Sequence, residues 1–235
     1  MSSVFKFKEF DVLQKDSVLK VGTDSMLLGA MIDSGHSRSG LDLGAGTGVL
    51  SLMVAQKNKD IYIDAIENDI PTYKECDFNF KSSQYSNRLE AISDSYFEYS
   101  FEKKYDLIFS NPPFYIEEGV NMKPSNRLSK HGSVMKFKKL ASLVVDVLAV
   151  QGCFWIVLPY KLDHLLLEMN VFNNLFVNEL YNIHSKEIKL NSRVIVKFSF
   201  TKKKRVVKDL VLRKSDNTYT SEYIELTKDF HFNKL

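Results

Sequence analysis

The chain has 235 residues, which is long enough for one large α/β domain or for two small ones. Its hydrophobic content of 44% is ordinary, no apolar run approaches the roughly 20 residues that span a membrane, and the N-terminus lacks the apolar core of a signal peptide. The net charge of +3 creates no global field that would demand a nucleic-acid partner, and Cys76 and Cys153 lack the spacing of metal ligands. We expect a cytoplasmic protein with no metal ion and no membrane anchor, and we expect a monomer.

In chain order, the hydrophobic pattern first predicts two short strands, around residues 5–8 and 10–14, and then a loop through residues 20–24. From residue 40 onward, strands alternate with helices. The expected core strands are 40–43, 61–66, 89–92, 105–110 and 152–159, and the expected helices are 49–57, 71–80, 135–150 and 161–172.

This alternation implies an α/β fold with a doubly wound, mostly parallel sheet. Two late strands, 177–184 and 193–200, are close enough in sequence to pair as an antiparallel terminal hairpin, and one further strand is expected over 210–213. The chain has no internal repeat and no low-complexity linker. We therefore expect one domain over 1–235, made of an N-terminal cap segment (1–39), a core (40–200) and a C-terminal extension (201–235).

Three glycines follow the first core strand, in the run Asp42-Leu-Gly44-Ala-Gly46-Thr-Gly48. Glycines between a strand and a helix let the backbone approach a ligand and aim helix N–H groups at it. The dinucleotide fingerprint Gly-x-Gly-x-x-Gly is not matched, which disfavours a nicotinamide cofactor. Glu67 ends the next strand, where its carboxylate can accept hydrogen bonds from both ribose hydroxyls. The alternative is a plain tight turn, but the acidic residues on both sides of the loop favour a cofactor site.

The strand at 105–110 stops abruptly on Asn111-Pro112-Pro113-Phe114. Proline donates no backbone hydrogen bond, and a residue before proline is held extended. The segment therefore predicts a rigid shelf that displays an amide, a free carbonyl and an aromatic face. Such a shelf suits a planar group with an exocyclic amine, such as a nucleobase or a carboxamide. The alternative is a strand-ending turn.

The shelf explains how a poor nucleophile could react, because the lone pair of an exocyclic aromatic amine is delocalised into the ring. If the Asn111 side-chain oxygen and the Pro112 carbonyl accept the two N–H bonds, the nitrogen can pyramidalise toward a sulfonium methyl group. Phe114 can stack on the ring and hold it in line. We expect catalytic roles for Asn111, Pro112, Pro113 and Phe114. Together with the glycine loop and Glu67, the shelf fits S-adenosyl-L-methionine better than a nucleotide.

Asp-x-Gly-x-Gly-x-Gly followed by Asn-Pro-Pro-Phe resembles the Rossmann-like, class I S-adenosylmethionine-dependent methyltransferases that modify amino groups, whose sheet has seven strands. The flanking segments are similar to the bacterial valine tRNA (adenine-37-N6)-methyltransferases, at residues 5–10, 19–30, 121–131, 210–213, 219–223 and 229–230. This resemblance spans nearly the whole chain. It implies methylation of N6 of the adenine immediately 3′ of the anticodon, with tRNA as the partner.

The resemblance also implies that Thr23 and Asp24 lie near the methionine end of the cofactor and Asp94 near its adenine. The expected cofactor-binding residues are Thr23, Asp24, Asp42, Gly44, Ala45, Gly46, Gly48, Glu67, Asp94 and Asn111. Residues 115–134 lack clear periodicity, and we interpret them as a substrate loop. Its candidate RNA contacts are Lys123, Arg127, Lys130 and His131, with Lys130 standing where the family leads us to expect an arginine. A second candidate is the basic run 202–205, for which the alternative is a solvated turn.

Two other functions stay open from the residues. The same chemistry could act on guanine N2 of ribosomal RNA or on glutamine N5 of a release factor, although the glutamine enzymes usually carry a longer helical domain ahead of the glycine loop. A different class would be an inactive, methyltransferase-like RNA-binding module. Intact Asp42, Gly44, Glu67 and Asn111 argue against a decayed site.

Overall fold

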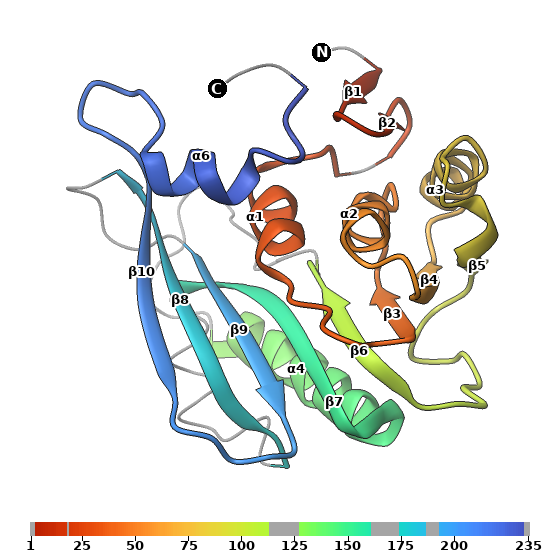
Figure 1. The fold of residues 1–235 in the computed structure, drawn as a ribbon. Coiled ribbons are helices and arrows are strands. Elements are labelled where there is room, and N and C mark those ends of the chain that lie inside the picture. Colours follow the sequence, from red (N-terminus) through yellow and green to blue (C-terminus); the bar gives the residue numbers. More distant parts are fainter. Residues whose placement is uncertain (1–2, 18, 113–126, 161–173, 187–192, 233–235) are drawn as a thin grey trace.

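A computed structural model of the chain describes residues 3–17, 19–112, 127–160, 174–186 and 193–232. A large central sheet runs through the molecule, with helices on both faces (Figure 1). Its eight strands lie in the order β10-β8-β9-β7-β6-β3-β4-β5. The strands are β3 (Ser39–Leu43), β4 (Tyr62–Glu67), β5 (Leu89–Ser93), β6 (Tyr105–Ser110), β7 (Leu148–Pro159), β8 (Phe176–Lys186), β9 (Arg193–Ser199) and β10 (Val206–Arg213).

All neighbouring strands of this sheet are parallel except at β9, which runs antiparallel to both β7 and β8. The predicted α/β class and the antiparallel pairing of the two late strands are confirmed. The sheet has one strand more than the expected seven, because β10 pairs along β8 from Val206 onward. The exposed, charged start of β10 shows no apolar alternation, so the pattern predicted only its last residues.

Two layers of helices enclose the sheet (Figure 1). The first layer contains α1 (Thr23–Met31), α2 (Val49–Lys57) and α3 (Ile70–Lys81), and the opposite face is covered by α4 (Arg127–Val147). The remaining elements are a small antiparallel hairpin of β1 (Val4–Lys6) and β2 (Asp11–Leu13), a short 3-10 turn (Ser86–Arg88), and α6 (Ser221–Thr227), which contacts α1 and β10. None of the described helices is long and apolar enough to cross a membrane.

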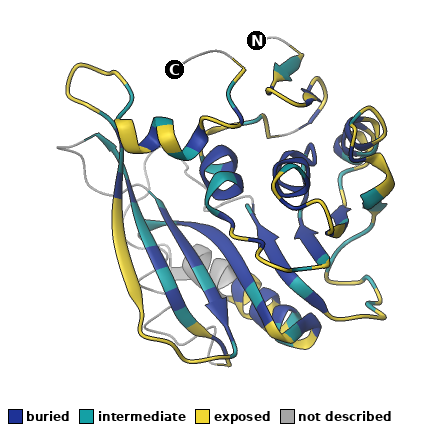
Figure 2. Cartoon of the chain, viewed as in Figure 1, coloured by how far each residue is buried: buried dark blue, intermediate teal, exposed yellow. Residues whose placement is uncertain are grey.

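The core lies on both faces of the sheet, as the buried strands in Figure 2 show. The first cluster joins the sheet to α1 and α2 and reaches from Phe7, near the start of the chain, to Phe230, near its end. The second cluster joins the other face to Leu140 and Val144 of α4. The two ends of the chain also meet directly, because the Lys8 backbone N–H donates to the Phe230 carbonyl at 3.1 Å.

Helix α1 occupies part of the segment that we expected to be a loop. Its central residues from Ser25 to Gly29 are all buried, so the helix has no polar face and its sequence shows no helical period. A Cβ atom on Gly29 would lie 2.4 Å from Sδ of Met53, so glycine lets α1 lie close against α2. The expected loop at 20–24 therefore ends where α1 begins, at Thr23.

The prediction for α4 was wrong at both ends. The helix begins at Arg127, within the stretch that we interpreted as a loop, and it ends at Val147 rather than at residue 150. Gly132 and several serines have low helix propensity and hide the first turns from a pattern search. Leu148 already belongs to β7, where it pairs with Tyr105 before the register shifts. The helix expected over 161–172 lies outside the described residues.

Candidate cofactor and substrate site

The candidate site lies where the carboxyl ends of β3, β4 and β6 meet. Strand β3 has β4 on one side and β6 on the other, and the chain leaves β3 toward α2 on one face and leaves β6 toward the face of α4. This is a topological switch point, the place where open α/β sheets bind their ligands. The predicted residues Gly44, Glu67 and Asn111 follow or end these three strands, so the fold brings them together.

A cavity of ≈ 310 Å³ opens at this point. Its size lies at the lower end of the range of about 300–1,000 Å³ that small-molecule sites occupy. Four of the predicted site residues line it, namely Gly44, Gly46, Glu67 and Asn111. The other lining residues, which the sequence patterns did not indicate, are Leu19, Asn68, Asp69, Thr72, Ser95, Tyr96 and Phe97.

The glycine loop is held by backbone hydrogen bonds to the neighbouring strand. The N–H groups of Gly44 and Ala45 both donate to the carbonyl of Ile66, each at 3.0 Å. Gly44, Gly46 and Gly48 have φ angles of +74°, +59° and +79°, in the left-handed region that glycine adopts without strain.

The space around the loop differs between two of these glycines. A Cβ atom on Gly46 would meet no other atom within 4 Å, and Gly46 lines the cavity. A Cβ atom on Gly48 would lie 2.5 Å from the Phe80 ring and 2.8 Å from Sγ of Cys76, both on α3. Gly46 therefore leaves room for a ligand, and Gly48 leaves room for a helix.

Glu67 connects the glycine loop to the end of β4. Its Oε2 accepts from the Gly46 N–H at 2.9 Å, and its Oε1 accepts from the Asp69 N–H at 2.9 Å. A carboxylate has about four acceptor positions, so each oxygen keeps capacity for a further hydrogen bond. Because Glu67 also lines the cavity, its carboxylate can receive hydroxyl donors from a bound ligand.

Asp42 is fully buried at the end of β3 and lies outside the lining of the cavity. Its Oδ2 accepts from Oγ of Ser51 at 2.8 Å, whereas its Oδ1 has no hydrogen-bond partner among the described residues. Burial, with a smaller contribution from the Glu67 charge, raises the pKa of Asp42 from 3.8 to about 7.

Two aromatic residues after β5 form a wall of the cavity. The ring centroids of Tyr96 and Phe97 are 4.5 Å apart, and the Tyr96 ring faces Gly44, where a Cβ atom would lie 3.8 Å from it. Phe97 is 43% exposed, so part of its ring is open to a planar ligand. Burial raises the pKa of Tyr96, and the Glu67 carboxylate raises it further, so its hydroxyl stays neutral. Both residues follow the carboxyl end of β5, on the side of the sheet where the site was expected. Their position after a strand end was the feature of the sequence that could have predicted them.

The N-terminal segment contributes Leu19 to the cavity and is bound to α3. Both oxygens of Glu75 accept backbone N–H groups of this segment, from Asp16 at 2.7 Å and from Ser17 at 2.9 Å. Asn79 binds the N–H and the carbonyl of Leu13, at 2.7 and 2.9 Å. Helix α3 therefore fixes the path of the chain that leads to Leu19.

Three further predicted residues, Thr23, Asp24 and Asp94, do not line the cavity. Asp24 forms an ion pair with Arg193, with 2.8 Å between Oδ2 and Nε, and Thr23 precedes it at the start of α1. The Asp94 N–H donates to the Glu67 carbonyl at 3.2 Å, and its side chain accepts from the Ser95 N–H at 2.6 Å.

Only the first half of the predicted shelf lies within the described residues. Asn111 is half-buried and lines the cavity, and Pro112 is buried. Oγ of Ser110 donates to the Leu43 carbonyl at 2.6 Å, which ties the end of β6 to the end of β3. Pro113, Phe114 and Lys123 lie outside the described residues. Arg127, Lys130 and His131 belong to α4, and the described part of the structure does not include their side chains.

The donor set of the cavity fits S-adenosyl-L-methionine. Glu67 offers carboxylate oxygens suited to a ribose, Tyr96 and Phe97 offer an aromatic surface suited to adenine, and Gly46 leaves open space for the close approach of a ligand. Among the described residues, no group of three or more His, Cys, Asp or Glu side chains could hold a metal ion.

Comparison with solved structures identifies the class of fold. A predicted O-methyltransferase from Agrobacterium tumefaciens is similar with a TM-score of 0.69 at 14% identity, over 88% of this chain and 96% of that chain. The glycopeptide N-methyltransferase MtfA, solved with S-adenosyl-L-methionine, is similar with a TM-score of 0.55 at 11% identity, over 77% and 100%. The family model of the methyltransferase small domain matches residues 16–178. The fold and the site thus define a class I methyltransferase that uses S-adenosyl-L-methionine.

Curated relatives match nearly the full length of the chain. Proteins from Pedobacter heparinus (32% identity, 98% of each chain), Flavobacterium psychrophilum (34%, 97% of this chain and 99% of the relative) and Actinobacillus pleuropneumoniae (33%, 99% and 98%) share one name, tRNA1(Val) (adenine(37)-N6)-methyltransferase. The chain belongs to this family.

Proposed function

We propose that this protein transfers a methyl group from S-adenosyl-L-methionine to the exocyclic N6 of adenine 37 in the anticodon loop of a tRNA, with valine tRNA as the first candidate. The family supports the substrate, since the relatives carry that name. The observation that supports methyl transfer at this site is that Asn111 lines the same cavity as Gly44, Gly46 and Glu67. Such an activity belongs in the cytoplasm, where tRNA is found, and it needs only one copy of the chain.

The proposed roles follow from the positions of the side chains. Glu67 accepts the ribose hydroxyls, and the ring of Phe97 packs on the adenine of the cofactor. The family resemblance supports a place for Asp24, which pairs with Arg193, near the methionine end of the cofactor. The bound cofactor supplies an electrophilic sulfonium methyl group. We also propose that the whole chain is one domain, because a single core cluster includes residues of the N-terminal segment, the sheet and the C-terminal extension.

Asn111 positions the target amine in this proposal. Its side-chain oxygen and the Pro112 carbonyl accept the two N–H bonds of the adenine N6, which frees the nitrogen lone pair for attack. The proton leaves after methyl transfer, because the methylated ammonium is acidic, so no strong base is needed beside the amine. Pro113 and Phe114 complete the shelf as the base-stacking part of the proposal.

Labelled-methyl transfer to unmodified tRNA, followed by nucleoside analysis, tests the function. The expected product is N6-methyladenosine at position 37. Label on a guanine of ribosomal RNA or on a release-factor glutamine would contradict the proposed substrate. No transfer to any pool despite cofactor binding would favour an RNA-binding module without catalysis.

Replacing Asn111 tests the shelf directly. Asn111→Ala should keep cofactor affinity and lower turnover by about 100-fold or more, the scale of removing one oriented hydrogen-bonding group from an active site. Asn174→Ala removes an exposed amide that does not line the cavity and serves as the matched control, with turnover unchanged. Turnover that survives in Asn111→Ala would overturn the proposed mechanism.

A further inference from the structure

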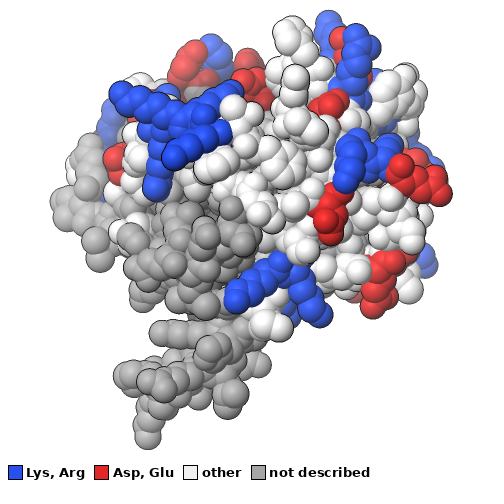
Figure 3. Space-filling model, turned by 90° about the horizontal axis from the view of Figure 1, so that it is seen from below, with Lys and Arg blue, Asp and Glu red and all other residues white. Residues whose placement is uncertain are grey.

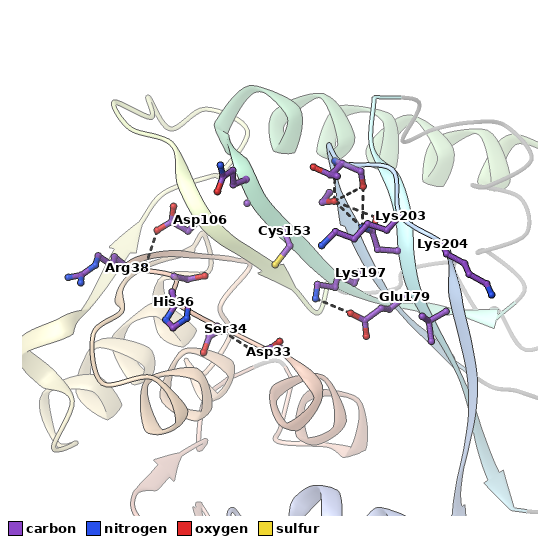
Figure 4. Close-up of a pocket in the computed structure, with 18 residues that line it drawn as sticks. Asp33, Ser34, His36, Arg38, Asp106, Cys153, Glu179, Lys197, Lys203 and Lys204 are labelled. Carbon is purple, nitrogen blue, oxygen red and sulfur yellow. Dashed lines mark hydrogen bonds and ion pairs between the residues drawn. The ribbon is translucent and has the colours of Figure 1, made fainter.

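A second, larger cavity lies at the end of the sheet where the parallel strands begin, opposite the strand ends that form the candidate site. Its volume is ≈ 740 Å³, and its walls are the loop 33–38 between α1 and β3 and the adjoining parts of β7, β8, β9 and β10. Figure 4 shows His36 and Arg38 on the first wall and Lys197, Lys203 and Lys204 on the second. None of the residues with a proposed role in methyl transfer lines this cavity, which we call the basal groove.

The positive charge of the protein is concentrated beside the basal groove. Residues 202–208 contain five Lys or Arg and no acidic residue, a formal charge of +5, whereas the whole chain carries +3. The rest of the chain therefore carries −2. All residues from 202 to 208 are exposed. Figure 3, which looks onto this end of the sheet, shows a large group of Lys and Arg side chains at the upper left of the face and smaller groups elsewhere on it.

The acidic residues that line the groove, Asp33, Asp106 and Glu179, accept hydrogen bonds from groups outside the basic run. Glu179 is bound to Lys197 at 2.9 Å and to the Tyr181 hydroxyl at 2.6 Å. Asp106 on the far wall accepts the backbone N–H groups of Arg38 and Ser39, at 2.9 and 3.1 Å.

The acidic residue of the strand that follows the basic run also has partners outside that run. Asp209 of β10 is bound to His184 at 2.8 Å and to Asn182 at 3.2 Å. Within the described residues, the side chains of Lys203, Lys204 and Arg205 are exposed and make no hydrogen bond or ion pair, so they are available to an external anion.

We infer that the basic run 202–205 and the rim of the basal groove bind the phosphate backbone of the tRNA, away from the methylated base. This inference rests on the proposed function, since it takes tRNA as the partner. Strand β10 has eight residues, so it separates the basic run from the catalytic edge of the sheet by about 26 Å at a rise of about 3.3 Å per residue. The contact would therefore hold the body of the RNA while Asn111 holds the base.

Lysines beside an edge strand can also serve only to prevent sheets from joining edge to edge. In this chain, Lys202, Lys203, Lys204 and Arg205 precede β10, in the loop after β9, where they do not cover its free edge. A protective role predicts no effect on RNA affinity. If these side chains contact phosphates, removing them should weaken RNA binding. It should also make the affinity depend less on salt, because fewer counterions are released when the RNA binds.

The test compares Lys203→Ala/Lys204→Ala with Lys59→Ala/Lys74→Ala, a double variant that removes two exposed lysines elsewhere. Binding to a fluorescent, full-length unmodified tRNA is measured over a salt series, and labelled-methyl transfer is measured in the same samples. We expect the first variant to bind at least about fivefold more weakly and to reduce the salt slope by roughly two. The control variant should match the wild type, and cofactor affinity should be unchanged in both.

The outcomes separate this inference from the proposed function. Equal tRNA affinity in the two variants, with methyl transfer intact, overturns the inference alone. Binding that depends on Lys203 and Lys204 without methyl transfer to adenine overturns the proposed function alone. A wild-type protein that binds no tRNA overturns both.

Discussion

Gly46 and Gly48 are two residues apart and share a left-handed backbone, yet they need glycine for different reasons. Gly46 faces open space in the cavity, and Gly48 faces Phe80 and Cys76 of α3. An added methyl group at either position strains the backbone by about 1–3 kcal/mol. Only at Gly48 does it also overlap a packed core, which adds a further cost of about 1–3 kcal/mol.

We therefore expect Gly46→Ala to weaken cofactor binding with a modest loss of stability, and Gly48→Ala to cause the larger loss of stability. Thermal unfolding and calorimetric titration with S-adenosyl-L-methionine measure the two effects. Equal melting temperatures in the two variants would show that the contact between the loop and α3 is not as tight as the structure indicates.

Asp42 makes stability depend on pH. Its folded pKa of about 7 lies above its usual 3.8, so between these values the folded protein binds a proton that the unfolded chain has released. This contribution favours the folded state at low pH. As the pH rises from 4 to 7, the free energy of unfolding declines by about 1.4 kcal/mol for each step of one in pH.

Asp42→Asn should remove this dependence. The melting temperature of the variant relative to the wild type should rise between pH 5 and pH 8, because only the wild type must bury a carboxylate at the higher pH. Differential scanning calorimetry at several pH values measures the difference. If the difference in melting temperature between the variant and the wild type is constant or shrinks toward pH 8, Asp42 titrates near its ordinary pKa in the folded protein.

Among the elements, α3 has a role that its sequence did not indicate. Its Glu75 and Asn79 side chains bind backbone groups of the N-terminal segment, and this segment carries Leu19 into the cofactor cavity. A helix on the outside of the sheet therefore shapes the site through hydrogen bonds to another part of the chain.

Glu75→Gln replaces one of two acceptor oxygens with a donor, so one N–H of the segment loses its partner. We expect a loss of about 1–3 kcal/mol in stability and a weaker affinity for the cofactor. Asp77→Asn is the matched control on the same helix, since its ion pair with Lys81 is solvent-exposed and contributes little to stability. Denaturant unfolding and cofactor titration of both variants provide the measurement, and similar affinities in the two would contradict the role of α3.

Elements that form a continuous apolar run between clear boundaries were predicted well, and elements without such a run were not. Helix α2 spans the predicted residues Val49–Lys57, and β6 spans Tyr105–Ser110. Helix α1 was missed because it begins with three polar residues and contains Gly29, which has low helix propensity. The start of β10 was missed because it is exposed and shows no hydrophobic period.

At the scale of the whole molecule, the site divides into residues that the sequence pattern predicts and residues that tertiary packing brings in. Gly44, Glu67 and Asn111 were placed together from sequence, because parallel strands bring their carboxyl ends to one edge of a sheet. Leu19 and Thr72 enter the cavity from other elements, whose positions depend on tertiary packing. No local pattern encodes that packing, so these residues could be found only in the structure.

The hydrogen bonds of the glycine loop have a further consequence for the thermodynamics of binding. Ile66 and Glu67 fix Gly44, Ala45 and Gly46 through partners that belong to the fold itself. The conformational entropy of this loop is therefore lost when the chain folds, and ligand association does not have to order it again. The loop behaves as a preorganised receptor, and its affinity for the ligand should follow the integrity of the pairing between β3 and β4.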